Sequence, residues 1–279
     1  MADPPLRRRG RHPRDRGADP AAHPAGIRPD LRGGYAQLVG QLCRSGDRQL
    51  AIEAWRAFPR WVRWLPGAAG ALIARLRDLD DRTVWPAVAD ALVAVVTAGH
   101  GETLLAEALG ALTALDEAPA GGLDRPARRR VEAIVTRLAG RGSLTVPVRA
   151  TLGTAAEVLS AVDGFAPQAA RLLAAAIDPA DAADVAQLRD LVAERPVLAA
   201  RIARELPRRL GEHEPELLRP VAAELARQPR VADGLLALAY AEQGARLHWP
   251  EPWRAIVVRL RAHPAPEVRD AALELSLDR

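Results

Sequence analysis

The sequence is poor in cysteine and aromatic residues, and it contains neither lysine nor asparagine. Cys43 is the single cysteine among 279 residues, which excludes an intramolecular disulfide and a metal site built from several cysteines. Without lysine, the phosphate-binding motif GxxxxGK[ST] cannot occur. Aromatic residues make up 4% and apolar residues 49% of the chain. The apolar residues are mainly alanine, leucine and valine, which favour closely packed helices over sheets.

Long apolar runs are missing as well. No stretch reaches the ~18 uninterrupted apolar residues of a membrane-spanning helix. The first 34 residues carry charge and proline where a signal peptide would have an apolar segment. We therefore expect no membrane association and a cytoplasmic location. Arginine, alanine, glycine and proline have GC-rich codons, and their abundance indicates a bacterial source.

Residues 1–34 differ in composition from the rest of the chain. They contain eight arginines, six prolines and five glycines without apolar periodicity, which predicts a disordered arm. With four aspartates the arm has a net charge of +4, equal to that of the whole chain, so residues 35–279 are neutral overall. Any affinity for nucleic acid is therefore expected to be weak and to come from the arm. The arginines concerned are Arg7, Arg8, Arg9, Arg11, Arg14 and Arg16.

Beyond the arm, apolar residues recur at helical spacing in paired segments. The predicted helices are 35–45 and 48–57, 66–77 and 84–98, 101–116 and 124–140, 146–162 and 167–177, 181–194 and 196–210, 214–227 and 230–243, and 252–262 and 265–277. The pairs repeat at about 34–40 residues, the period of helical-repeat proteins. The sequence therefore predicts an all-α fold, a right-handed α-solenoid of about seven antiparallel helix pairs over residues 35–279.

The last pair carries the most specific pattern. Its second helix, in HPAPEVRDAALEL (263–275), has an apolar stripe formed by Val268, Ala271, Ala272 and Leu275. Two prolines, Pro264 and Pro266, separate it from the preceding helix. This segment resembles the second helix of HEAT repeats, which opens with Pro-x-Pro followed by Val-Arg and small residues; here these are Val268, Arg269, Ala271 and Ala272. Ala265 departs from the acidic residue often found between the two prolines. The resemblance implies a HEAT/armadillo/TPR-like solenoid, and residues 35–57 look equally like a TPR hairpin.

Motifs of catalysis and metal binding are absent from the sequence. None of the six histidines has another at helical spacing, and HExxH, CxxC, GxSxG and GxGxxG do not occur. We therefore expect no enzymatic activity, no catalytic residue, no cofactor and no metal ion.

The segment AWRAFPRWVRWLP (54–66) combines tryptophan and arginine, the residue types that dominate binding hot spots. Trp61 and Trp64 fall on one helical face, and Arg60 and Arg63 are their neighbours in the sequence. Packing of the rings into the joint between two hairpins is the favoured interpretation. The alternatives are a patch that binds a protein or peptide and, less favoured, contact with nucleic acid.

A second candidate contact lies at the C-terminal edge. On a helical wheel, Leu273 and Leu277 fall four residues apart on a side separate from both the apolar stripe and an acidic face. Leucines in this position either fold back, sit exposed, or dock a second copy, a partner or a neighbouring domain.

The sequence thus predicts a non-catalytic scaffold that binds a protein or peptide partner on the surface of its helical repeats. The alternative is a nucleic-acid-binding protein resembling the HEAT-like alkylpurine DNA glycosylases, with Trp85 and Asp81, or Trp249 and Trp253, in a cleft. The neutral charge of residues 35–279 argues against this alternative.

Overall fold

The computed structural model describes residues 23–116, 125–142 and 144–277, and this part of the chain consists of helices and their connections, without a β-strand. The α-helices are α1 (Arg32–Leu42), α2 (Arg48–Ala57), α3 (Ala68–Arg77), α4 (Trp85–Thr97), α5 (Leu104–Asp116), α6 (Pro126–Ala139), α7 (Val146–Ser160), α8 (Ala166–Ala176), α9 (Ala182–Val192), α10 (Pro196–Glu205), α11 (Pro207–Leu210), α12 (Pro215–Leu225), α13 (Val231–Ala241), α14 (Glu251–Arg261) and α15 (Pro266–Glu274). Short 3-10 helices are η1 (Pro24–Gly26), η2 (Pro29–Leu31), η3 (Phe58–Arg60), η4 (Val62–Trp64) and η5 (Glu242–Leu247).

The all-helical prediction is confirmed, and every predicted segment overlaps an α-helix. One predicted helix, 196–210, is instead divided into α10 and α11. Pro207 lacks a backbone N–H and its ring crowds the carbonyl one turn earlier, so the helix is interrupted after Glu205. Pro220, by contrast, lies within α12, which continues past it.

Helical structure begins earlier than the predicted boundary at residue 34. Two 3-10 turns, η1 and η2, precede α1, which starts at Arg32. Pro24 is buried and Ile27 packs against the hydrophobic core. The first residues of the body are therefore 23–34, and the arginine cluster of the predicted arm lies outside the described residues.

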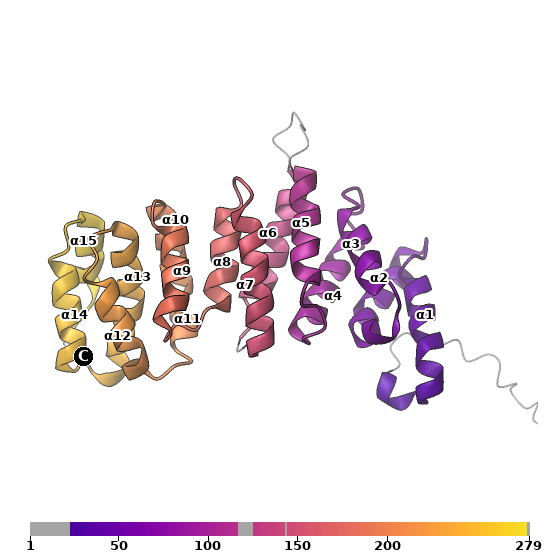
Figure 1. Ribbon diagram of the computed structural model, residues 1–279, viewed down its shortest axis with the longest axis horizontal. Coiled ribbons are helices and arrows are strands. Elements are labelled where there is room, and N and C mark those ends of the chain that lie inside the picture. Colours follow the sequence, from indigo (N-terminus) through magenta and orange to yellow (C-terminus); the bar gives the residue numbers. More distant parts are fainter. Residues whose placement is uncertain (1–22, 117–124, 143, 278–279) are drawn as a thin grey trace, which may run out of the picture.

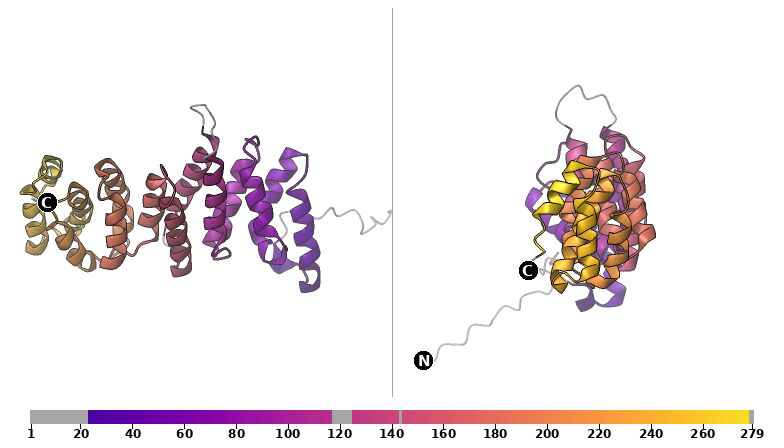
Figure 2. Two further views of the ribbon diagram at one scale, coloured as in Figure 1. Left: turned by 45° about the horizontal axis from the view of Figure 1, so that its top comes forward. Right: turned by 90° about the vertical axis from the view of Figure 1, so that its left-hand side faces the viewer.

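The helices form an elongated row (Figure 1), which is narrow when viewed along its long axis (Figure 2). From α1 to α8, α-helices pack against the next or the next but one in the chain, and the same alternation returns from α12 to α15. The segments that join α2 to α3, α4 to α5 and α10 to α12 all lie along the lower edge of Figure 1. Residues far apart in the sequence are thereby brought to one edge.

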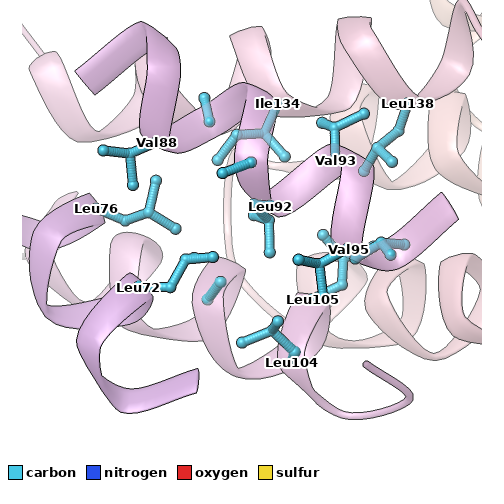
Figure 3. Packing of buried hydrophobic residues seen from close by; sticks show 14 of the residues in the cluster. Leu72, Leu76, Val88, Leu92, Val93, Val95, Leu104, Leu105, Ile134 and Leu138 are labelled. Atoms are coloured by element: carbon cyan, nitrogen blue, oxygen red, sulfur yellow. The ribbon is translucent and has the colours of Figure 1, made fainter. Parts of the chain in front are cut away.

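The buried apolar residues form two clusters. The first extends from α1 to α8 and the second from α8 to α15. Figure 3 shows part of the first cluster, where leucine, isoleucine and valine side chains of α3, α4, α5 and α6 meet. Helix α8 belongs to both, since Ala169 and Leu172 pack into the first cluster and Ala170 and Ala174 into the second.

Candidate functional site

The tryptophan–arginine segment folds as two successive 3-10 turns that follow α2. The amide of Trp61 donates to the carbonyl of Phe58, and the amide of Trp64 donates to the carbonyl of Trp61, both at 2.9 Å. Residues three apart are aligned in this geometry. The rings of Trp61 and Trp64 accordingly lie on the same side of the segment, with their centroids 6.0 Å apart.

The two tryptophans have different surroundings. Trp61 is 1% exposed and stacks on Tyr35 at 5.9 Å, so it fills the joint between α1 and the turns and is not available to a partner. Trp64 is only partly buried. The guanidinium carbons of Arg63 and Arg32 lie 4.7 Å and 5.6 Å from its ring centroid, within the range of cation–π attraction.

Trp64 faces a hollow of about 490 Å³ on the edge of the row. Three segments meet there: the residues leading into α1, the η3–η4 turns and the end of α4. We call this the Trp64 hollow; the side chains used below are His23, Arg32, Arg60, Arg63, Trp64 and His100.

Local backbone chemistry places these side chains. Gly99 adopts φ +75°, a left-handed conformation that ends α4, and the amide of His100 then donates to the carbonyl of Val95 at 3.1 Å. Nε of Arg32 donates to the carbonyl of Ile27 at 3.1 Å. Nδ1 of His23 accepts from the amide of Ala25 at 3.2 Å. The rim of the hollow is thus built from capped helix ends.

The Trp64 hollow has one sign of charge. Three arginines and two histidines line it, and none of the described residues lining it is Asp or Glu. Arg60 and Arg63 are exposed. Guanidinium groups bind carboxylate and phosphate oxygens through paired hydrogen bonds, while the indole offers an apolar face. The arrangement suits an anionic group beside an apolar one.

Three of these residues were not predicted as site residues. His23 and Arg32 come from the segment assigned to the arm, and His100 lies between two helices. No sequence pattern joins these three to Trp64. They are adjacent because the connections of successive helix pairs end on the same edge.

The predicted C-terminal pair of leucines is divided in the structure. Leu273 is 63% exposed on α15, whereas α15 ends at Glu274 and Leu277 packs against the second cluster. The prediction that both lie on one helical face is therefore corrected. Arg261 of α14 satisfies carbonyls at the end of α15, because it donates to the carbonyls of Ala272 at 3.2 Å and Leu275 at 2.8 Å.

The tryptophans considered for a nucleic-acid cleft have packing roles. Trp249 and Trp253 are buried, and the guanidinium carbon of Arg130 lies 5.1 Å from the Trp85 ring. Asp81 accepts from the amides of Thr83 and Val84 at the start of α4.

Comparison with known proteins gives no relative: no family model, no curated protein and no solved structure matches the chain. Within the described ranges, no group of three or more His, Cys, Asp or Glu side chains is placed to hold a metal ion. No helix in the same ranges is long and apolar enough to cross a membrane.

Proposed function

We propose that this chain is a cytoplasmic, non-catalytic scaffold, a HEAT-like α-solenoid that binds a protein or peptide partner on its surface. The elongated row supports the architecture, because most helices pack against the next helix or the next but one, as in repeat proteins, while α10 packs mainly on α13. Such folds offer extended surfaces, and no catalytic constellation is needed for this role.

The turn between α14 and α15 supports the resemblance to HEAT repeats. Arg269, which follows Pro-x-Pro-x-Val, reaches back and donates to the carbonyls of His263 at 2.9 Å and Pro264 at 2.7 Å. Val268 and Ala272 are fully buried. The residues on which the resemblance rests thus fix the turn and the packing of this pair.

The observation that carries the proposed activity is the Trp64 hollow. A partly buried indole between two guanidinium groups offers both a large apolar contact and charge-assisted hydrogen bonds, the combination found at hot spots. The surplus of cations selects an acidic segment. We therefore expect a partner segment in which Asp or Glu lies next to an apolar side chain.

The test is a peptide-display selection against the full chain, followed by affinity measurements on the enriched peptides. Enriched sequences should be acidic, and Trp64→Ala should weaken them at least tenfold, equivalent to about 1.4 kcal/mol. Arg63→Gln should weaken them, while Arg254→Gln, an exposed arginine on α14, should leave affinity unchanged. Peptides without acidic residues, or binding that Trp64→Ala does not alter, would contradict the proposal.

Because the Trp64 hollow is cationic and could also contact phosphates, the nucleic-acid alternative needs a test of its own. The scaffold proposal predicts that duplex DNA binds only through residues 1–22 and that deletion of this segment abolishes binding. The affinity should fall steeply between 50 and 200 mM salt, by ~10³-fold or more if all six arm arginines contact phosphates. Fluorescence anisotropy measures this. Salt-resistant binding by residues 23–279 would favour the nucleic-acid alternative.

A further inference from the structure

A second hollow, of about 510 Å³, lies between the end of α6, the C-terminal half of α8 and the α10–α11 bend. Five arginines and two glutamates are among the residues that line it. We call it the α8 hollow. It shares no residue with the Trp64 hollow, so the two hollows can be tested separately.

The interruption at Pro207 builds one wall of the α8 hollow. It turns α11 so that Arg209 reaches the end of α8, where it donates to the carbonyls of Ala175 and Ile177. These carbonyls belong to a helix end, which attracts positive charge. Burial lowers the pKa of the Arg209 guanidinium from its ordinary value, and nearby Glu212 raises it. The Arg209 guanidinium is therefore already hydrogen-bonded between α8 and α11, where it has a structural role.

A second arginine of the hollow, Arg171, also has its guanidinium group hydrogen-bonded within the chain. Arg171 donates to Glu132 at 2.8 Å, to Thr136 at 2.9 Å and to Glu205 at 3.1 Å, and its side chain is 10% exposed. Its charge is balanced by two carboxylates. Glu132 and Glu205, beside and in the hollow, are thus paired with Arg171, and both also contact Arg201.

The three remaining arginines of the hollow are not paired with a carboxylate of the described residues. Arg141, Arg204 and Arg208 are exposed and come from three different segments. In the part of the chain that the structure describes, the side chains of Arg141 and Arg208 have no hydrogen-bond or ion-pair partner. Arg204 uses only Nε, which donates to the carbonyl of Ala200 at 3.3 Å. The lining residues carry a net charge of +3, from five arginines and two glutamates.

We propose that the α8 hollow is a binding site for a phosphate monoester. Such a group carries a charge of about −1.5 to −2 at pH 7 and three terminal oxygens, which match the guanidinium groups of Arg141, Arg204 and Arg208, none of which has an ion-pair partner among the described residues. Arginine binds these oxygens through paired hydrogen bonds. A single carboxylate would neutralise only one of the three. A phosphodiester, with one charge and two free oxygens, should also bind more weakly.

The phosphate group can come from a small metabolite or from a phosphorylated residue of a protein. Both share the chemistry that the hollow recognises. Isothermal titration of the full chain with inorganic phosphate tests the site itself. Titrations with phenyl phosphate and with a phosphoserine peptide then identify the source, because tighter binding of the peptide assigns the group to a protein. Either order of affinity supports a phosphate site.

The decisive variant is Arg141→Gln with Arg208→Gln. Because both side chains are exposed and lack partners, the variant should keep the helical circular dichroism of the wild type and bind phosphate at least tenfold more weakly. The matched control is Arg254→Gln with Arg259→Gln, which removes the same charge from exposed positions of α14 and should bind within about twofold of wild type. Affinity of the wild type should also fall below about pH 6, where the monoester loses a charge.

Two results would overturn the proposal. One is a wild type that gives no saturable phosphate binding while remaining folded. The other is equal weakening by the two double variants, which would show a general effect of net charge. Neither result would bear on acidic peptides at the Trp64 hollow, whose lining residues are unchanged in both variants.

Discussion

The interior of each hydrophobic cluster and the seam between the clusters are held together differently. Inside the first cluster, α3 to α6 meet through fully buried aliphatic side chains (Figure 3). At the seam around α8, polar contacts bridge the clusters. Arg171 of α8 pairs with Glu205 of α10, and Arg209 of α11 donates to the carbonyls at the end of α8.

The two kinds of contact have different effects: apolar contacts stabilise the helices within a cluster, and polar contacts set the orientation of the helices at the seam. Apolar contacts are non-directional, so adjacent helices of one cluster stabilise each other over a broad surface. Hydrogen bonds and ion pairs require set distances and contribute about 1 kcal/mol each, but they fix how α10 and α11 are turned against α8. We therefore expect the row to separate most easily at the seam. The seam is also where packing leaves a hollow lined by arginines.

The largest effect is expected from breaking the seam with Arg209→Gln. The carbonyls of Ala175 and Ile177 would lose their shared donor, which costs about 1–3 kcal/mol for buried groups. Because the loss falls between the clusters, α9 to α15 should open before α1 to α7. Hydrogen exchange measured by mass spectrometry in low urea should show faster exchange confined to α9–α15.

The neighbouring Arg208→Gln is the matched control, since this arginine is exposed and should change stability by less than about 0.5 kcal/mol. Uniformly faster exchange along the whole row in Arg209→Gln would show that both clusters unfold as one unit. The distinction drawn between seam and interior would then be lost.

Each cluster contains a buried group that ionises at alkaline pH, the Cys43 thiol in the first and the Tyr240 hydroxyl in the second. Burial raises the pKa of the Cys43 thiol to about 12 in the first cluster, and burial also raises the pKa of Tyr240 in the second. The unfolded thiol ionises from about pH 9. Its contribution to stability is therefore present below pH 9 and is lost as pH rises toward 12.

Cys43→Ala should remove this part of the alkaline loss. The decrease in the urea midpoint between pH 8 and pH 11 should be smaller than in the wild type, and the wild-type thiol should react with iodoacetamide more slowly in the folded chain than in urea. The idea fails if the variant and the wild type lose stability in parallel across this window.

The helices could be predicted because their determinants are local. Apolar spacing predicted each segment, and the structure has an α-helix at every one of them. The division after Glu205 was missed because Pro207 lies within an apolar pattern that continues past it.

The two hollows could not be predicted because they depend on contacts between distant residues. Arg209 reaches carbonyls more than thirty residues earlier, and His100 meets Trp64 only through the alignment of successive connections. Trp64 and Arg63 were predicted as contact residues from composition alone. Composition could not separate them from Trp61, whose ring is buried.

The smallest effect is expected at the C-terminal edge, where the two leucines of one predicted face have separate environments. Leu273→Glu changes a side chain that is 63% exposed, and stability should change by less than about 0.5 kcal/mol. Leu277→Glu places a charge against the second cluster and should cost about 1 kcal/mol or more.

Self-association at this edge is a separate test. If the edge docks a second copy, size-exclusion chromatography with light scattering should show a dimer, and Leu273→Glu alone should dissociate this dimer without loss of helix. A wild type that is monomeric at high concentration would remove self-association from this edge. Equal destabilisation by the two variants would show that Leu273 is packed as Leu277 is.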